Sequence, residues 1–330
     1  MNPSPLCRID GLGIAVPDRV VTNRDFEATL DTNDQWIVDR TGIRERRWAG
    51  RETSLASLCT DASRGALEQA GVNPADVDAI ILGTVTPDHR LPSTACEIQA
   101  MLGARQAIPF DVAAACPGWI YSLAIAEGFI AAGRARTILV IGGEKLSTIT
   151  DTEDRSTAIL FGDGAGAALV RPAEGGPRGM ISCVLGGDGT LLDLLCIPGG
   201  GSADPISHAV VEERSQFMKM KGREVFKAAV LAMATACEGA LARAGVGVED
   251  IELLVPHQAN VRIIEATARH TGIPIDRVMV NVDRYGNTST ASIPLALHQA
   301  ESEGRLRRDA LILVVSFGAG FTWGAAVIRW

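Results

Sequence analysis

Cys116 is the residue of this chain best placed to act as a nucleophile. It stands in FDVAAACPGW (residues 110–119), where a predicted strand passes into an apolar helical pattern. Pro117 suits the first position of a helix, because the N–H that proline lacks has no partner there. A thiol beside a helix N-terminus is expected to have a lowered pKa and to form the thiolate that thioester exchange needs. The position alone does not decide the matter, since most cysteines are small buried hydrophobic residues.

Two further side chains complete a candidate site. His257 follows the apolar run LLVP (253–256), and α/β proteins place ligand-binding groups just past the carboxyl ends of buried strands. Asn287 lies in YGNTSTASIP (285–294), where its amide can donate a hydrogen bond to an oxygen that gains negative charge. Alternatives stay open, because His89 also follows a strand and Asn287 could belong to a helix N-cap.

A Cys, a His and an Asn in this order fit two reactions. One is papain-type hydrolysis, and the other is carbon–carbon bond formation on a thioester. The papain signature is missing, because Cys116 is followed by PGW rather than by GSCW and is far from the N-terminus. Small residues in GAG (318–320) could bring backbone N–H groups close to a ligand and complete an oxyanion hole with the N–H of Cys116. Condensation is the favoured reaction.

Composition limits the class of protein. The 330 residues are 47% hydrophobic and 21% charged, and the net charge of -8 disfavours a nucleic-acid-binding protein. The N-terminal MNPSPLCRID has no apolar core of a signal peptide, and no apolar run has the length of a membrane span. The seven cysteines include no C-x-x-C pair, which favours reduced thiols in a cytoplasmic protein without a structural metal.

Short apolar runs alternate with helical patterns, as in an α/β protein with a largely parallel sheet. Strands are predicted at residues 80–82, 137–141, 167–170, 253–255, 278–280 and 311–315. Helices are predicted at 55–70, 117–132, 225–244 and 263–270, and glycines follow three of them.

The sequence also contains an internal repeat. AGVNPADVDAI (70–80) resembles AGVGVEDIELL (244–254), and GAALV (166–170) resembles GAAVI (324–328), in the same order. We therefore predict two related halves, residues 1–172 with the nucleophile and residues 173–330 with His257 and Asn287. A Gly- and Pro-rich connection at 171–205 should join them, with the site in a cleft between the halves.

Seven motifs together resemble the β-ketoacyl-acyl-carrier-protein synthase III family of the thiolase-like condensing enzymes. They are DTNDQWI (31–37), RTGIRER (40–46), the Cys116 segment, FGDGAGA (161–167), PHQAN (256–260), YGNTS (285–289) and FGAGFTWG (317–324). The resemblance covers nearly the whole chain. It implies the five-layered α-β-α-β-α thiolase fold and a homodimer.

The resemblance also implies a reaction and roles. An acyl-CoA starter would load Cys116 and then condense with malonyl-acyl carrier protein, with loss of CO2, to begin fatty-acid or related acyl-chain synthesis without cofactor or metal. The N–H groups of Cys116 and Ala319 would form the oxyanion hole, and His257 and Asn287 would stabilise the enolate. Arg262 would dock the carrier protein. The substrate-binding positions would be Trp36, Arg40, Leu91, Arg155, Gly222 and Phe226.

Two departures and two alternatives accompany the resemblance. Pro117 stands where the family usually has Ala, Ser or Thr, and it should stiffen the nucleophile turn without removing the Cys116 N–H. Leu91 stands where some members have Phe, at a position thought to bound the partner's acyl pocket, so we expect starters larger than acetyl. The alternatives are an acyltransferase or specialised-metabolite synthase with another acceptor, and a non-catalytic module that binds acyl-CoA or carrier protein.

Overall fold

Two mixed β-sheets form the centre of the molecule in the computed structural model, which describes residues 5–330. The first sheet has the order β1-β7-β6-β4-β5 and the second β11-β12-β13-β8. The strands of the first are β1 (Cys7–Ala15), β4 (Ala79–Gly83), β5 (Ile108–Val112), β6 (Ile138–Glu144) and β7 (Gly164–Pro172). Those of the second are β8 (Gly179–Gly187), β11 (Leu253–Pro256), β12 (Leu311–Gly318) and β13 (Thr322–Arg329).

Both sheets have the same pattern of strand direction. β4 runs parallel to β6, and the pairs β6–β7 and β7–β1 are antiparallel. In the same way β11 runs parallel to β12, and the pairs β12–β13 and β13–β8 are antiparallel. Each sheet takes its strands from one stretch of the chain, residues 7–172 or 179–329.

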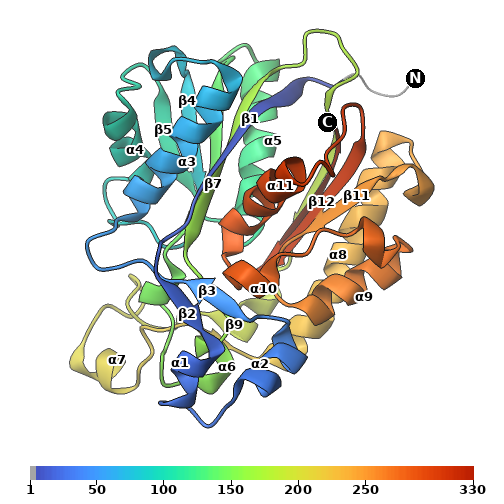
Figure 1. Cartoon of the computed structure of the whole chain (residues 1–330). Helices are drawn as coiled ribbons and strands as arrows, with labels where there is room; N and C mark the ends of the chain where they lie inside the picture. The colour runs from blue at the N-terminus through green and yellow to red at the C-terminus, as the bar shows by residue number, and fades with distance from the viewer. Residues whose placement is uncertain (1–4) are drawn as a thin grey trace.

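Helices cover both sheets and fill the space between them, which gives the five layers predicted from the family resemblance (Figure 1). The outer helices of the first sheet are α3 (Leu55–Ala70) and α4 (Thr94–Leu102), and those of the second are α8 (Gly222–Ala244) and α9 (Val261–Thr271). The inner layer is α5 (Gly118–Ala131) with α11 (Ser292–Ser302). The largest core cluster joins these two helices to strands of both sheets, so the two parts of the chain form one body.

Smaller elements gather towards the lower end of Figure 1, and some of them supply residues that line the pocket described below. They are β2 (Val20–Thr22), α1 (Asn23–Glu27), α2 (Asp34–Thr41), β3 (Glu45–Arg47), α6 (Arg155–Ala158), β9 (Leu195–Cys196), α7 (His208–Glu212), β10 (Lys219–Met220) and α10 (Val282–Tyr285).

The helix ends predicted from capping residues agree with the structure to within three residues. α3 covers the predicted residues, because the Ser54 side chain accepts a hydrogen bond from the N–H of Ser57 and Gly71 ends the helix at a φ of +63°. α8 begins at Gly222 rather than at 225. α5 begins at Gly118, so that Pro117 is the N-cap residue and not the first helical residue.

The strand predicted at 278–280 is absent. Val278 forms only an isolated bridge to Leu254, and the backbone beyond it is bound by the buried side chain of Gln258. The Gln258 amide donates to the carbonyl of Met279 and accepts from the N–H groups of Asn281 and Val282. These bonds replace the ladder that a strand would form.

Two glycine-rich strands escaped prediction. β8 occupies residues 179–187 inside the predicted connection 171–205, so that connection is much shorter than expected. β1 contains Gly11 and Gly13 because α3 crosses it closely; a Cβ on Gly13 would lie 2.1 Å from the carbonyl oxygen of Ala62.

α8 is long and apolar enough to span a membrane by length and composition alone. Its buried residues pack against β8, β12 and β13, as in the core helix of a globular protein. One such helix is therefore weak evidence for a membrane span.

Candidate active site

Cys116 lies on a sharp turn between β5 and α5. The preceding residue, Ala115, has a φ of +49°, which is uncommon for a residue with a side chain and is typical of turns that aim a functional group. Gly318 of β12 packs against this turn so closely that a Cβ there would be 2.6 Å from the backbone nitrogen of Cys116. The nucleophile turn is therefore held by the end of a strand from the second sheet.

A pocket of about 1000 Å³ opens above Cys116, at the carboxyl ends of β11 and β12. It brings together the three predicted residues from distant parts of the chain. The residues of the predicted site that line it are Trp36, Arg40, Cys116, Arg155, Gly222, Phe226, His257, Arg262, Asn287 and Ala319. Leu91 does not line the pocket of its own chain and is 87% exposed, and His89 lies outside it in an exposed pair with Glu97.

His257 is buried at the end of β11, and its Nδ1 lies 2.6 Å from the hydroxyl oxygen of Ser292. Burial lowers the pKa of His257 to about 3, so the imidazole is neutral near pH 7. The contact with Ser292 occupies Nδ1 and leaves Nε2 as the ring nitrogen available to a ligand.

Asn287 uses its side-chain oxygen within the protein. Oδ1 accepts a hydrogen bond of 2.9 Å from the N–H of Ser289, while the backbone of Asn287 is bound to Leu160 and Gly162. This bond fixes the orientation of the amide and leaves its NH2 group free to donate to a ligand. The loop therefore presents Asn287 to the pocket as a hydrogen-bond donor.

The thiol of Cys116 differs from the prediction in its acidity. It is only partly exposed, and burial raises its pKa to about 12, although the Ser289 hydroxyl at 3.5 Å opposes the shift. The predicted lowering at the helix N-terminus is wrong because desolvation of the thiolate outweighs it. The proton must therefore leave Cys116 during the reaction.

Two backbone N–H groups beside the thiol are free to bind a ligand. Neither the N–H of Cys116 nor that of Ala319 donates to another residue within the described part of the chain. Gly318 lets the end of β12 approach the turn that carries Cys116. The Thr322 hydroxyl holds the two together, because it is within hydrogen-bond distance of the carbonyls of both Ala114 and Ala319. The arrangement suits an oxyanion hole.

Trp36 forms an aromatic surface at the pocket entrance. The guanidinium groups of Arg40 and Arg155 lie 4.8 and 4.9 Å from the centre of its ring. Arg155 also donates to the carbonyl of Asp31. Cation–π contacts hold these side chains together, and they form a positively charged rim.

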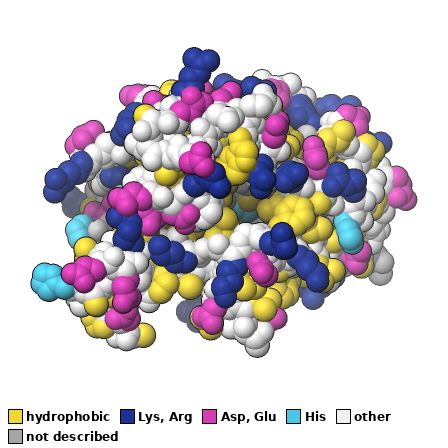
Figure 2. Space-filling model, turned by 90° about the horizontal axis from the view of Figure 1, so that it is seen from below, with side chains coloured by type: hydrophobic (Ala, Val, Ile, Leu, Met, Phe, Trp, Pro, Cys, Tyr) yellow, Lys and Arg dark blue, Asp and Glu magenta, His cyan; other side chains and the backbone are white. Residues whose placement is uncertain are grey.

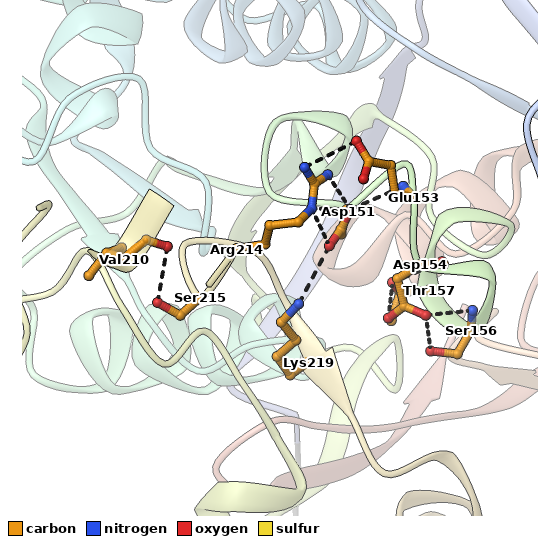
Figure 3. A network of polar contacts seen from close by, with 9 residues as sticks. All are labelled: Asp151, Glu153, Asp154, Ser156, Thr157, Val210, Arg214, Ser215 and Lys219. Atoms are coloured by element: carbon orange, nitrogen blue, oxygen red, sulfur yellow. Dashed lines mark hydrogen bonds and ion pairs between the residues drawn. The ribbon is translucent and has the colours of Figure 1, made fainter. Parts of the chain in front are cut away.

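A polar network supports another wall of the pocket (Figure 3). Arg214 and Lys219 both reach Asp151, and Arg214 also contacts Glu153. The hydrogen bonds from Arg214 lower the pKa of the nearly buried Asp151 to about 2. The network ties the segment around α7 and β10 to residues 146–155, and both segments contribute pocket-lining side chains.

Three site residues were missed in the sequence: Glu144, Ser289 and Ser292. Glu144 is fully buried at the end of β6 and accepts hydrogen bonds from the hydroxyls of Ser289 and Thr290. One signal was available for Glu144, because a carboxylate that ends an entirely apolar strand is rarely buried without a role. The serines gave no signal beyond their place in the Asn287 segment.

Known proteins share this architecture over the whole chain. Residues 110–189 match the family described as 3-oxoacyl-[acyl-carrier-protein (ACP)] synthase III, and residues 241–330 match its C-terminal part. The β-ketoacyl-[acyl-carrier-protein] synthase III of Roseiflexus castenholzii is 48% identical over 322 residues, which cover 98% of this chain and 97% of the relative.

Solved structures agree with these matches. The 3-oxoacyl-[acyl-carrier-protein] synthase III of Aquifex aeolicus superposes with a TM-score of 0.91 at 46% identity, covering 98% of this chain and 100% of the other. The priming β-ketosynthase of the R1128 polyketide biosynthetic pathway superposes with a TM-score of 0.90 at 36% identity, covering 99% and 97%. The shared sequence and the layered fold together show that the chain belongs to the 3-oxoacyl-[acyl-carrier-protein] synthase III family of thiolase-like condensing enzymes.

Proposed function

We propose that this protein condenses an acyl-CoA starter with malonyl-acyl carrier protein, with loss of CO2, and so initiates fatty-acid or related acyl-chain synthesis. One observation carries the proposal: a single pocket contains a thiol, a neutral imidazole and an amide whose NH2 group can donate. Simple acyl transfer needs the thiol but not the two further donors. The names of the relatives describe the same product class.

In the first half-reaction, the Cys116 sulfur attacks the thioester carbonyl of acyl-CoA. A bond forms between Sγ and the carbonyl carbon, and the bond from that carbon to the CoA sulfur breaks. The N–H groups of Cys116 and Ala319 hold the oxygen that becomes negative in between. An acyl-Cys116 thioester and free CoA result.

In the second half-reaction, His257 and Asn287 bind the carbonyl oxygen of the malonyl thioester. The bond to the carboxylate breaks, CO2 leaves, and the electron pair forms an enolate whose oxygen is stabilised by the two donors. The enolate carbon then attacks the acyl group and releases the Cys116 thiolate. This role requires the His257 proton on Nε2, so the Ser292 hydroxyl, 2.6 Å from Nδ1, would be the donor in that contact.

Intact-protein mass spectrometry tests the proposal directly. The enzyme is incubated with acetyl-, isobutyryl-, hexanoyl- and octanoyl-CoA and then with malonyl-acyl carrier protein. We expect one acyl mass on Cys116, followed by its discharge and release of a β-ketoacyl carrier protein. Acyl mass that malonyl carrier protein cannot discharge would contradict condensation.

The same experiment separates the alternatives. The similarity to a priming β-ketosynthase of a polyketide pathway favours a specialised-metabolite synthase as the second candidate. In that case the acyl-enzyme should be discharged by a different acceptor. A non-catalytic binding module should bind acyl-CoA without gaining any covalent mass.

We propose that coenzyme A binds along the rim formed by Trp36, Arg40 and Arg155, and that Gly222 and Phe226, which line the same pocket, also contact it. The guanidinium groups suit the phosphates of the nucleotide, and the indole ring suits stacking. The apolar side chain of Phe226 is 39% exposed at this entrance, which a bound ligand would cover.

The pocket entrance carries the charge that an acidic carrier protein needs. Figure 2 shows this face, with Lys and Arg side chains around apolar surface. Five arginines and one glutamate line the pocket: Arg40, Arg155, Arg223, Arg262, Arg269 and Glu265. A local positive patch can thus outweigh the net charge of -8, because salt screens charges more than about 8–10 Å away.

Reversing the charge of Arg262 should weaken carrier-protein docking. We expect Arg262→Glu to raise the KM for malonyl-acyl carrier protein by about tenfold at low ionic strength, because exposed interface charges steer association. Acyl loading from acyl-CoA should change much less. The matched control is Arg308→Glu, an exposed arginine outside the pocket. Equal effects of the two variants, or an effect that does not shrink with added salt, would contradict this docking site.

The starter should be larger than acetyl. The predicted place of Leu91 is at the partner's acyl pocket, and its 87% exposure on the single chain leaves it available there. We expect higher kcat/KM with one of the four- to eight-carbon or branched starters than with acetyl-CoA, and Leu91→Phe should shift the preference towards acetyl. Turnover with acetyl-CoA that equals or exceeds that of every larger starter would refute the hypothesis.

We further propose a homodimer, supported by the position of β5 at the edge of the first sheet. An edge strand that a second copy extends would cover the exposed Ile108 and bring Leu91 towards the partner. Light scattering in solution tests the oligomeric state.

The two sheets share one pattern of parallel and antiparallel strand pairs, which supports a duplicated chain with halves at 1–172 and 173–330. The seven free cysteines support a reducing compartment such as the cytoplasm.

A further inference from the structure

Glu144 and Ser289 form a chain of polar contacts that reaches the nucleophile. The Ser289 hydroxyl lies 3.5 Å from Sγ of Cys116 and 3.1 Å from Oε1 of Glu144. A serine hydroxyl has one proton, and a carboxylate attracts it more strongly than a thiol sulfur does. The geometry places the hydroxyl as a donor to both Sγ and Oε1. When its single proton turns to Oε1, the Ser289 oxygen can accept the thiol proton. The contacts thus run from thiol to hydroxyl to carboxylate.

Within residues 5–330, no Lys, Arg or His forms an ion pair with the Glu144 carboxylate. The carboxylate is fully buried and accepts hydrogen bonds from neutral donors on two loops: Thr84, Val85, Thr86, Ser289 and Thr290. Burial raises the pKa of Glu144, while these donors oppose the shift. A buried carboxylate that is hydrogen-bonded but not neutralised is suited to take up a proton.

The backbone holds the middle member of the chain in a conformation that a side-chain-bearing residue rarely adopts. Ser289 has a φ of +49° and is 3% exposed. Such strain persists only where surrounding contacts enforce it, and it is concentrated at functional sites. Here the Asn287 side chain accepts from the N–H of Ser289 and fixes the turn.

We propose that Ser289 and Glu144 form a proton relay that activates Cys116 for acyl loading; this rests on the proposed function. The thiol proton passes to the Ser289 oxygen as the Ser289 proton passes to Oε1 of Glu144. The resulting thiolate attacks acyl-CoA, and CoA leaves as a thiolate that takes a proton from solvent. During condensation the Cys116 thiolate is released and recovers its proton from Glu144 through Ser289.

The relay supplies a proton acceptor for Cys116, which the other residues of the pocket do not provide. Burial raises the pKa of Cys116 to about 12, and His257 is engaged through Nδ1 by Ser292, so the thiol needs another proton acceptor. Two other titratable side chains near Glu144 do not compete with it: burial raises the pKa of Cys59 well above its usual value, and Lys145 donates to the carbonyls of Gly50 and Thr53. Glu144 is therefore the acceptor within reach of the thiol.

Single-turnover loading of acyl-CoA, followed by rapid quenching and mass spectrometry, tests the relay. Ser289→Ala and Glu144→Gln should each slow loading by about 10²-fold, the size of a general-base contribution. Their loading rates should rise about tenfold per pH unit between about pH 6 and pH 9, because solvent hydroxide must then form the thiolate. The matched control is Thr290→Val, which removes a 3.1 Å hydrogen bond to the same oxygen of Glu144 but no contact with the thiol.

Three outcomes would overturn the relay. The first is a wild-type loading rate in Ser289→Ala, and the second is a pH dependence of loading in the variants that matches that of the wild-type enzyme. The third is a loss of loading rate in Thr290→Val as large as in Ser289→Ala, which would make Glu144 a structural anchor. Should Glu144→Gln fail to fold, the comparison of the Ser289 and Thr290 variants still decides. Ser289→Ala and Glu144→Gln can be loaded with the acyl group by long incubation at high pH. The acyl group on Cys116 should then be transferred to malonyl-acyl carrier protein at close to the wild-type rate. Loading and discharge by the wild-type enzyme test the proposed function separately, whatever the relay variants do.

Discussion

Replacing Cys116 by alanine should abolish covalent acyl loading. The variant retains the pocket and the N–H groups of residues 116 and 319, but it lacks the thiol that contacts Ser289. Loss of a nucleophile lowers turnover by on the order of 10⁴-fold or more. Intact-protein mass spectrometry after incubation with acyl-CoA should therefore show no added acyl mass.

A second thiol in the same pocket supplies the control. Cys196 lines the pocket and is partly exposed, but it lies in β9, away from the nucleophile turn. Cys196→Ala should still gain one acyl mass. Acyl mass on Cys116→Ala, or its loss in Cys196→Ala alone, would identify Cys196 as the acylated residue and overturn the assignment.

The sequence was informative where chemistry depends on local position. Cys116 and His257 both stand at ends of predicted elements, and the ends of buried strands were recognisable as apolar runs bounded by Pro, Gly or Asp. The family motifs then linked these positions to Asn287 and Ala319. The structure brings all four into one pocket.

Properties that depend on three-dimensional surroundings were not predictable in this way. The sequence placed Cys116 beside a helix N-terminus, but only packing shows that desolvation dominates its acidity. The contacts of Ser289 with Glu144 and of Ser292 with His257 join residues that are far apart or unremarkable in the sequence. Likewise, the orientation of the Asn287 amide depends on a backbone N–H in the same loop.

The failed strand prediction has the same origin. Residues 278–280 have the composition of a buried strand, yet the Gln258 side chain takes the hydrogen bonds that a ladder would use. β1 and β8 had too many glycines to be recognised, and in β1 the close crossing of α3 explains them. Long-range packing thus decided which segments became strands.

Removing either of the two proposed enolate donors should slow condensation strongly and leave loading nearly unchanged. His257→Ala and Asn287→Ala should each load acyl groups at close to the wild-type rate and lose condensation by on the order of 10²-fold or more, as expected for a lost oxyanion donor. The two steps are measured separately, by acyl mass gain from acyl-CoA and by release of β-ketoacyl carrier protein from preloaded enzyme. Loss of loading in Asn287→Ala would contradict these roles.

The pH dependence of condensation should carry no inflection from His257. Its pKa of about 3 means that the imidazole is charged only below that pH and is neutral throughout the range of about 5 to 8. A rate of condensation that changes with a pKa near 6.5 and loses this change in His257→Ala would contradict a buried neutral donor.

The double variant shows whether the two donors bind one oxygen. If Nε2 of His257 and the NH2 group of Asn287 hold the same enolate oxygen, neither can hold it well alone, and their contributions are strongly non-additive. His257→Ala combined with Asn287→Ala should then lose little more condensation activity than the worse single variant. Losses that multiply would mean that the donors act on different atoms or in different steps. In the structure a neutral imidazole and the NH2 group of an oriented amide line the same pocket, which favours the shared oxygen.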